Sequence, residues 1–219
     1  MNKTCPIIRK NVTNYLSTVL LVLTLIFCSS CARTYFPLEP QKLNYTNTQQ
    51  KEGVTFSYQH SVLENKYRNK ERRREIKLIA VKCTNNTDRD LVFGTDIQLV
   101  REKGRGTDMA DDYYIYRQLR QRPASHLWWM LFAFLTVNVT QGSAYNQTTS
   151  TYPVGLALAP ILTITNASIA ASSNRRFRQD LEEHNLLGRT IRKGETIYGL
   201  VGIKMHQYEG LSLKGLPAH

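Results

Sequence analysis

The 219-residue sequence lacks the motifs by which many enzymes are recognised. It contains neither a G-x-S-x-G nucleophile elbow nor a glycine-rich loop of the kind that cradles phosphate. Glu182, Glu183 and His184 are adjacent in an expected helix, so their side chains point in different directions and do not form a catalytic group. These absences predict a non-enzymatic protein without a cofactor.

Histidine is scarce, and its spacing does not match a metal site. The five histidines are scattered, without an HExxH motif or another zinc-ligand spacing. Asp108, Asp111 and Asp112 are clustered carboxylates, which hard cations prefer, but they do not follow the spacing of an EF-hand loop. We therefore expect the start of an exposed helix there and no metal site.

Acidic residues are absent from the first 30 positions. Lys3, Arg9 and Lys10 precede an apolar run over 16–27, and small residues follow it. This order is typical of a secretory signal peptide, and the apolar core of about a dozen residues is shorter than the roughly 20 that span a bilayer. The pattern favours a cleaved signal peptide over residues 1–30 rather than a permanent transmembrane helix.

Two cysteines compete as the site of lipid attachment. Phe27 before Cys28 is too large for a peptidase pocket that accepts small side chains, whereas Ser29 and Ser30 precede Cys31. The segment resembles the lipobox of bacterial lipoproteins, except that Cys28 takes the position usual for Leu. The resemblance implies a mature chain that begins with lipidated Cys31, carrying acyl chains such as palmitate. An ordinary secreted protein is the alternative.

The residues after Cys31 indicate where such a lipoprotein would reside. Several acyl chains, each stabilised by about 0.8 kcal/mol per buried CH₂, anchor a protein stably. Ala32 stands where Asp would resemble an inner-membrane retention signal, and no acid occurs before Glu39. We expect the periplasmic face of the outer membrane, with the lipid bilayer as one partner and another envelope protein as a further candidate partner.

Removing residues 1–30 leaves few cysteines and many positive charges. If Cys31 is acylated, Cys83 is the only thiol left, so an intrachain disulfide is excluded, and we expect Cys83 to be buried and inert. The mature chain has 29 − 3 = 26 basic and 17 acidic residues, a net charge of +9. This charge suits phosphate-bearing surfaces, and export argues against nucleic acid as a partner. A small-molecule ligand is not indicated.

Residues 31–53 are polar and aperiodic, which predicts a flexible tether after the lipid. Alternating apolar residues predict strands over 54–59, 76–83, 91–100 and 197–205, with a last strand at 211–213. Short helices are expected over 113–121 and 177–187. The charge run 66–75, with Arg72, Arg73 and Arg74, indicates a solvated hairpin turn or a patch that binds anionic surfaces.

Two apolar runs, 127–137 and 153–171, predict a hydrophobic helical hairpin. Arginines flank it on both sides: Arg117, Arg120 and Arg122 before, and Arg175, Arg176 and Arg178 after. Aromatic side chains lie in the first run, namely Trp128, Trp129, Phe132 and Phe134. Such flanks favour the headgroup zone of a membrane. The hairpin either enters the bilayer or packs on the sheet as buried core helices.

The stretch 174–203 is the most distinctive part of the chain, with Asn174-Arg175-Arg176-Phe177 and Lys193-Gly194-Glu195-Thr196-Ile197-Tyr198-Gly199. It resembles a group of uncharacterised lipoproteins from Bacteroides-like bacteria. Together with 76–100, the resemblance implies an immunoglobulin-like antiparallel β-sandwich over 54–216, with an inserted hydrophobic hairpin over 123–173. The expected fold class is therefore mainly β with helices (α+β).

Three functions remain open at this level. The first is a lipid-anchored accessory or interaction protein of the cell envelope. The second is a periplasmic module that holds anionic lipid or lipopolysaccharide headgroups through Arg72, Arg73 and Arg74. The third is an integral membrane protein whose residues 126–171 form a transmembrane hairpin.

Overall fold

The computed structural model describes residues 31–101, 106–143 and 146–214, and the expected signal peptide lies outside them. The described residues belong to two compact units. Unit 1 contains residues 31–32 and Arg122–Ile169, and unit 2 contains Arg33–Gln121 and residues 170–214. The fold is α+β, with antiparallel sheets and three α-helices among the described residues.

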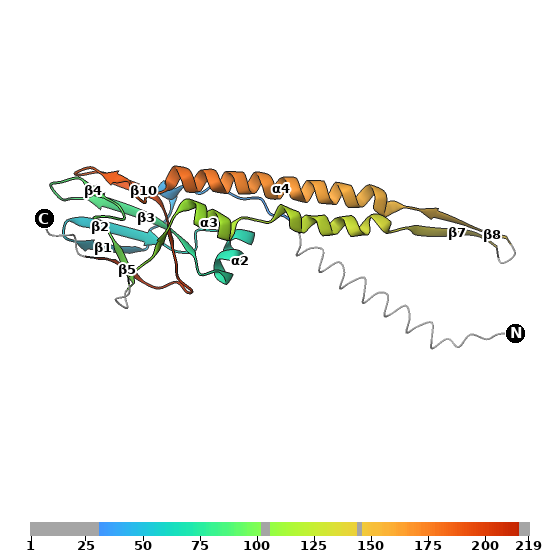
Figure 1. Cartoon of the computed structure of the whole chain (residues 1–219), viewed down its shortest axis with the longest axis horizontal. Helices are drawn as coiled ribbons and strands as arrows, with labels where there is room; N and C mark the ends of the chain where they lie inside the picture. Colours follow the sequence, from blue (N-terminus) through green and yellow to red (C-terminus); the bar gives the residue numbers. More distant parts are fainter. Residues whose placement is uncertain (1–30, 102–105, 144–145, 215–219) are drawn as a thin grey trace. The chain divides into compact units, whose positions relative to one another are not determined.

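Unit 2 is built on a five-stranded antiparallel sheet (Figure 1). Its strand order is β1 (Asn47–Lys51), β2 (Val54–Gln59), β3 (Lys77–Asn85), β10 (Thr196–Ile203) and β6 (Met109–Ala110). β3 pairs with β10 over eight residues, from Lys77 opposite Ile203 to Thr84 opposite Thr196. The sheet thus joins segments more than a hundred residues apart in the sequence.

Both faces of the central strand β3 are buried, which explains its nearly continuous apolar sequence. Successive side chains in a strand point to opposite faces. Ile79, Val81 and Cys83 contribute to one apolar core, whereas Leu78 and Ala80 contribute to the other. The sheet is therefore the middle layer of unit 2.

Short strands cover the first face of this sheet. β4 (Leu91–Val92) pairs with β9 (Thr190–Ile191), and β5 (Leu99–Arg101) pairs with β11 (Leu211–Leu213). Phe93 and Leu211, both fully buried, belong to the same apolar core as Phe56 of β2. The single strand expected over 91–100 is thus two short strands, because Gly94 has a positive φ and a turn separates them.

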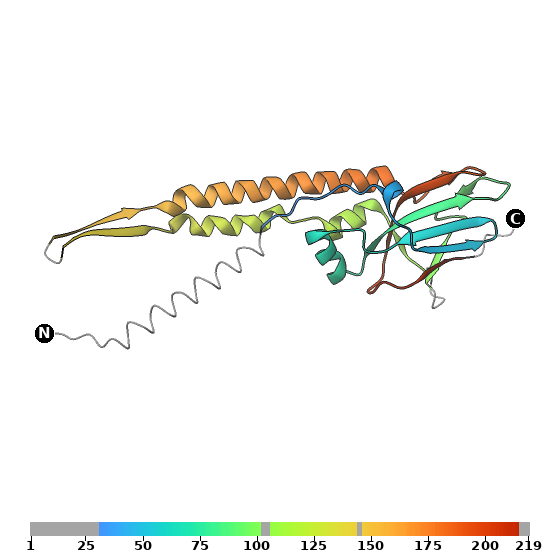
Figure 2. The same cartoon turned by 180° about the vertical axis from the view of Figure 1, so that it is seen from behind.

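Helices cover the second face (Figure 2). They are α2 (Asn65–Arg73), α3 (Asp112–Leu119) and the C-terminal part of α4 (Val154–His184). Tyr67 of α2, Leu119 of α3 and Phe177 of α4 share one core with Leu78 and Leu200 of the sheet. The remaining element of this unit is a short 3₁₀ turn, η1 (Pro40–Lys42).

The charge run around Arg72 is a helix, which corrects the expected hairpin turn. Leu63, Tyr67 and Glu71 recur every four residues and are all buried, so one face of α2 packs on the sheet. The basic residues occupy the other positions: Arg68, Arg72 and Arg73 are exposed, and Lys66 and Lys70 are half-buried. The helix expected at 113–121 is confirmed within a few residues as α3. The strands expected at 197–205 and 211–213 are confirmed in the same way as β10 and β11.

The described part of 33–53 is packed, unlike the expected tether. The Tyr35 hydroxyl donates to Asp180 Oδ2 at 2.8 Å, and the Leu38 amide donates to the same oxygen at 2.7 Å. The Tyr35 ring lies 5.2 Å from that of Phe177. Further on, β1 pairs with β2 despite its polar side chains, because strand pairing uses the backbone. Composition alone does not reveal these contacts.

Unit 1 consists of a 3₁₀ helix, a two-stranded ribbon and the N-terminal part of α4. η2 (Pro123–Phe134) leads into β7 (Val137–Ser143), which pairs with β8 (Asn146–Tyr152) over seven residues. Within this unit η2 and α4 run side by side, and the ribbon continues beyond their ends (Figure 1). The polar stretch between the two apolar runs is therefore a β-ribbon, and the second run belongs to a helix that continues to His184.

Candidate membrane-contacting surface

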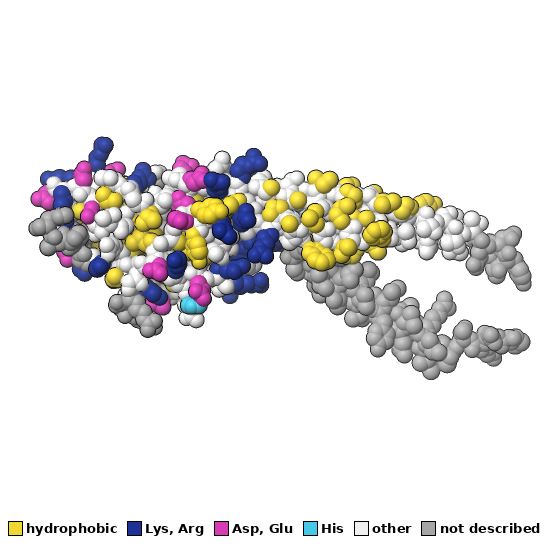
Figure 3. Space-filling model, viewed as in Figure 1, with side chains coloured by type: hydrophobic (Ala, Val, Ile, Leu, Met, Phe, Trp, Pro, Cys, Tyr) yellow, Lys and Arg dark blue, Asp and Glu magenta, His cyan; other side chains and the backbone are white. Residues whose placement is uncertain are grey.

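Unit 1 exposes far more large apolar side chains than unit 2. Among the described residues, unit 2 exposes four, namely Phe36, Tyr113, Tyr114 and Leu187. Unit 1 exposes fourteen: Leu127, Trp128, Met130, Leu131, Phe134, Leu135, Val137, Val139, Tyr152, Leu156, Leu158, Ile161, Leu162 and Ile164. Figure 3 shows apolar side chains gathered over η2 and the start of α4. Contiguous apolar surface of this kind marks contact with a membrane or another protein.

The first 18 residues of α4, 154–171, contain no charged residue. Among the described residues, α4 is the one helix long and apolar enough to cross a membrane, judged by length and composition only. In its most apolar stretch only 28% of the residues are buried. A core helix of a water-soluble protein would be mostly buried, so this stretch of α4 does not match the expected alternative of a buried core helix, whereas the C-terminal part of α4 packs on the sheet.

η2 and α4 touch where the ribbon begins. The Gly155 amide donates to the Leu135 carbonyl at 2.9 Å. A Cβ atom at Gly155 would lie only 2.0 Å from the Phe132 carbonyl oxygen, so no side chain fits there. Glycine therefore allows the two backbones to approach closely, as small residues do between membrane helices.

Polar side chains of α4 in this unit are satisfied by the helix itself. Thr163 Oγ1 donates to the Ala159 carbonyl at 2.8 Å, and Asn166 Nδ2 donates to the Leu162 carbonyl at 2.9 Å. Such bonds to the preceding turn lower the cost of a polar side chain in an apolar medium. Thr163 and Asn166 thus do not prevent contact with lipid.

The expected lipidation site lies beside α4. The Ala32 amide donates to Asn166 Oδ1 at 2.8 Å, and both groups are buried. Cys31 is half-buried. The contact fixes Ala32 next to Asn166, two residues beyond Ile164, which is the last exposed large apolar residue of unit 1 among those described. Nothing in the local sequence pattern indicates this contact.

The four aromatic residues expected at a membrane interface divide into two pairs. Trp128 is 71% exposed and Phe134 is 85% exposed. Trp129 is buried and Phe132 half-buried, with ring centroids 6.1 Å apart. Trp128 and Phe134 are thus available to lipid, whereas Trp129 and Phe132 pack within unit 1. Sequence analysis missed the five exposed large apolar residues of α4 at 156, 158, 161, 162 and 164, although their apolar character was visible.

The arginine clusters occur on the helical layer of unit 2. Arg72, Arg73 and Arg74 are exposed at the end of α2, and Arg175 and Arg176 are exposed on α4. Figure 3 shows a dense group of Lys and Arg side chains over the α2 and α3 helices. The structure thus brings both clusters to the same face of the sheet.

Arg178 is exposed on α4 but is already paired. Its Nε lies 2.7 Å from Glu182 Oε1 one turn later. This hydrogen bond and the attraction to the carboxylate raise the pKa of Arg178. Arg178 is therefore a poorer candidate for an anionic surface than its two neighbours in the same cluster.

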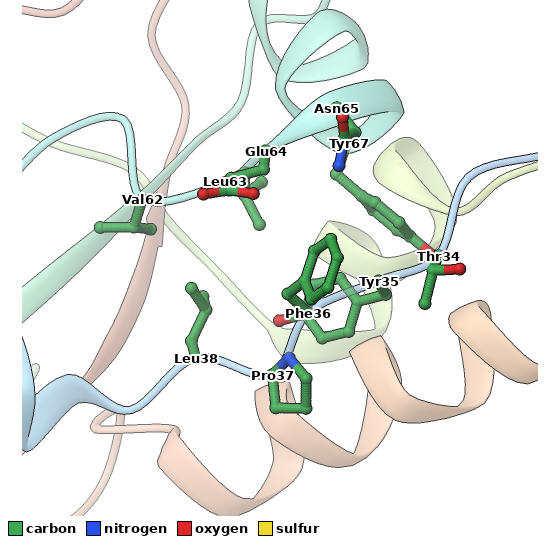
Figure 4. A pocket seen from close by; sticks show the side chains of 10 residues that line it. All are labelled: Thr34, Tyr35, Phe36, Pro37, Leu38, Val62, Leu63, Glu64, Asn65 and Tyr67. Atoms are coloured by element: carbon green, nitrogen blue, oxygen red, sulfur yellow. The ribbon is translucent and has the colours of Figure 1, made fainter.

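A small cavity in unit 2 is lined by residues of the N-terminal segment and of the start of α2 (Figure 4). Its volume is about 90 Å³, below the roughly 300–1,000 Å³ of typical ligand sites. The hydroxyls near it already have partners, because Tyr35 donates to Asp180 and Tyr67 donates to Asn174 at 3.1 Å. The two tyrosine hydroxyls are therefore engaged in structural hydrogen bonds within unit 2.

The clustered aspartates serve the helix α3, as expected for a helix start. Asp111 caps it by accepting a hydrogen bond from the Tyr114 amide at 2.6 Å. Asp112 accepts one from Asn185 at 2.8 Å, and partial burial raises its pKa. In the part of the chain that the structure describes, no group of three or more His, Cys, Asp or Glu could hold a metal ion.

One buried polar cluster was not expected from the sequence. Glu71 Oε1 accepts from the Leu78 amide at 2.7 Å, while the ammonium of Lys77 donates to the carbonyls of Glu71 and Arg74 at 2.5 and 2.9 Å. Burial raises the pKa of Glu71 and lowers that of Lys77. The cluster joins the end of α2 to the start of β3, and its bonds are structural.

Comparison of the chain with protein-family models, with curated proteins and with solved structures gives no match. The function must therefore be argued from the geometry of the two units alone.

Proposed function

We propose that this chain is a non-enzymatic lipoprotein of a bacterial envelope that contacts its membrane twice. Acylated Cys31 provides the first contact, and the apolar surface of residues 127–164 provides the second. The protein acts as an accessory or interaction subunit at the periplasmic face of the outer membrane. The observation that carries the proposal is the concentration of fourteen exposed large apolar side chains in unit 1.

The bilayer is the occupant that this surface fits best. Its exposed residues come from both η2 and α4, so apolar side chains surround the pair rather than line one groove. Arg122 precedes η2, and Arg175 is the first charged residue of α4. Arginine at the ends of an apolar segment favours the headgroup zone, where its side chain reaches water and phosphate. A protein partner would usually bury one face and leave the opposite face polar.

The lipid contact is tested by labelling the full precursor with palmitate in cells. We expect Cys31→Ala to abolish labelling and Cys28→Ala to retain it. Labelling of the Cys31→Ala protein would refute the lipid assignment.

The apolar contact requires a form without the lipid and without an uncleaved signal peptide. We define the anchorless form as residues 32–219 exported behind an ordinary cleavable secretory signal. We expect it to stay in the membrane fraction after alkaline carbonate extraction, because unit 1 holds it there. Its complete release would remove the apolar contact from the proposal while leaving the lipid contact intact.

A second candidate function is supported by the exposed arginines of unit 2. Arg72, Arg73 and Arg74 lie at the end of α2, and Arg175 and Arg176 lie on α4; all are exposed on helices that cover the same face of the sheet, which suits anionic lipid or lipopolysaccharide headgroups. Co-sedimentation with anionic liposomes at two salt concentrations tests it, using a triple Arg-to-Ser variant at 72–74. The apolar surface of the anchorless form would also bind liposomes and would hide the effect of the arginines. The comparison is therefore made in an anchorless form with aspartates at 158, 161 and 164, with and without the triple Arg-to-Ser substitution. Equal salt-sensitive binding with and without the arginines excludes this function.

We also propose that unit 2 is an immunoglobulin-like sandwich. Its support is the antiparallel sheet packed through one apolar core against the strand pairs β4–β9 and β5–β11. Helices on the opposite face of that sheet would then be additions to the sandwich. An experimental structure of unit 2 with its strand connectivity tests this assignment.

A further inference from the structure

The ribbon β7–β8 differs in chemistry from the helices that precede and follow it. Its side chains at 138, 140, 141 and 148–151 are Asn, Thr, Gln and Ser, and all are exposed. The Thr140 and Thr149 hydroxyls share a hydrogen bond of 3.0 Å across the strands, and the Thr151 hydroxyl donates to Asn138 Oδ1 at 2.7 Å. The apolar residues Val137, Val139 and Tyr152 lie at the ribbon's helical end.

A ribbon of this kind is not stable inside the hydrocarbon of a bilayer. Each of its two strands has one neighbour only, so backbone N–H and C=O groups along both outer edges have no strand partner within the described residues. In hydrocarbon each unsatisfied backbone group costs several kcal/mol, and open sheet edges do not occur there. If η2 and α4 enter the bilayer, the polar part of the ribbon must lie in water or among headgroups.

The two apolar segments on either side of the ribbon, residues 127–137 and 154–171, are called the legs. They are long enough to carry the ribbon across the hydrocarbon core of a bilayer. Residues 154–171 form 18 residues of α-helix, about 27 Å at 1.5 Å per residue. In η2 the apolar residues 127–134 extend about 16 Å, because a 3₁₀ helix rises about 2.0 Å per residue, and the rest of the apolar run, 135–137, adds about 10 Å as extended backbone. Both lengths approach the roughly 30 Å of a hydrocarbon core. The short first run therefore matches the longer α-helical one, because its backbone rises more per residue.

Cys31 identifies the side from which the legs enter. Ala32 is bonded to Asn166, which lies twelve residues, or about 18 Å, from the ribbon end of α4 at Val154. Asn166 is only five residues, or about 8 Å, from Ala171 at the other end of the apolar stretch. The lipid attachment point is therefore near the end of the legs that bears the arginines and far from the ribbon.

We propose that the legs span the membrane and that the polar ribbon strands, 138–143 and 146–151, emerge on the face opposite the leaflet that holds the Cys31 lipid. The inference rests on the proposed function, since it requires unit 1 to be in the bilayer. In this topology the protein exposes residues to two aqueous compartments, one on each side of the membrane. For a lipoprotein in the inner leaflet of the outer membrane, the ribbon would be displayed at the cell surface.

Cysteine accessibility in cells tests this topology on the full lipidated protein. Thr148→Cys marks the ribbon, Asp88→Cys marks an exposed turn of unit 2, and Leu158→Cys marks the apolar legs. The reagent is a maleimide attached to a polyethylene glycol chain too large to enter membrane pores. It is applied to intact cells, to cells with a permeabilised outer membrane, and after detergent. Cys83 is buried, and a parallel set with Cys83→Ala excludes its contribution.

We expect Thr148→Cys and Asp88→Cys to become reactive at different stages of permeabilisation, and Leu158→Cys to react only in detergent. Reaction of the ribbon and unit 2 at the same stage overturns the topology, and so does protection of Thr148→Cys until detergent is added. Carbonate extraction of the anchorless form separates the two proposals. An anchorless form that resists extraction, while ribbon and unit 2 label at one stage, shows a protein that contacts the membrane without crossing it. Release of the anchorless form removes the apolar contact on which both proposals depend and leaves only the lipid contact.

Discussion

The substitution Ile161→Asp in the anchorless form asks how much the apolar surface contributes to membrane binding. Ile161 is 61% exposed and lies near the middle of residues 154–171. The substitution removes no buried contact of consequence and adds one charge. In water it should leave the fold unchanged, because exposed positions tolerate polar residues.

The expected magnitude follows from the position of Ile161 in the proposed span. At the centre of a membrane helix, Ile contributes about −0.3 to −0.6 kcal/mol to insertion and Asp costs about 2.5–3.5 kcal/mol. The difference is about 3–4 kcal/mol, roughly a hundredfold to a thousandfold in partitioning. The seven large aliphatic residues of 154–171 together contribute only about −3 kcal/mol on the same scale. One central aspartate should therefore offset the contribution of the whole stretch.

The assay is the fraction of anchorless protein that remains in membranes after carbonate extraction. Tyr113→Asp is the matched control, since Tyr113 is 66% exposed but lies in unit 2 on α3. We expect release of the Ile161→Asp protein and retention of the control, with equal helical circular dichroism in detergent. Equal retention of both proteins would refute the assignment of α4 to the bilayer.

Three further predictions concern unit 2. Tyr35→Phe should lower the free energy of unfolding by about 1.5–3 kcal/mol in urea titration, because it removes a buried hydrogen bond to the Asp180 carboxylate; an unchanged midpoint would contradict the packed N-terminal segment. Burial raises the pKa of Glu71, so its contribution to stability is full below the pKa of an ordinary glutamate and is lost as the pH rises through the higher folded value. Glu71→Gln should therefore gain stability relative to the wild type at pH 8 and not at pH 4, and a constant difference across that range would exclude this origin. Burial raises the pKa of Cys83 to about 12, so its thiol should react with a disulfide reagent only after unfolding; reaction in the native protein would show that Cys83 is accessible.

The periodic parts of unit 2 could be predicted from the sequence because burial leaves a repeating pattern. β2, β10 and α3 occur near their expected positions, since each has apolar residues at the spacing of its own secondary structure. The order of the strands could not be predicted, because β3 and β10 pair across more than a hundred residues. The polar strand β1 was missed for a different reason: its pairing depends on backbone groups that every residue possesses.

The candidate surface was predictable in position but not in form. The apolar runs and flanking arginines indicated membrane contact, and Trp128 and Phe134 are exposed as that contact requires. The 3₁₀ form of η2, the ribbon and the bond from Ala32 to Asn166 depend on tertiary contacts that leave no local pattern. The close approach of Gly155 to the Phe132 carbonyl is likewise a tertiary contact that the sequence does not reveal.

The central claim is that the apolar surface of unit 1 lies in lipid, and the fluorescence of Trp128 measures this most directly. The chain has two tryptophans, so Trp129→Phe in the anchorless form leaves Trp128, which is 71% exposed, as the only indole. On reconstitution into vesicles, we predict a shift of its emission to shorter wavelength and quenching by lipids brominated on their acyl chains. Emission typical of water and unquenched by those lipids, in protein that remains folded, would contradict the account.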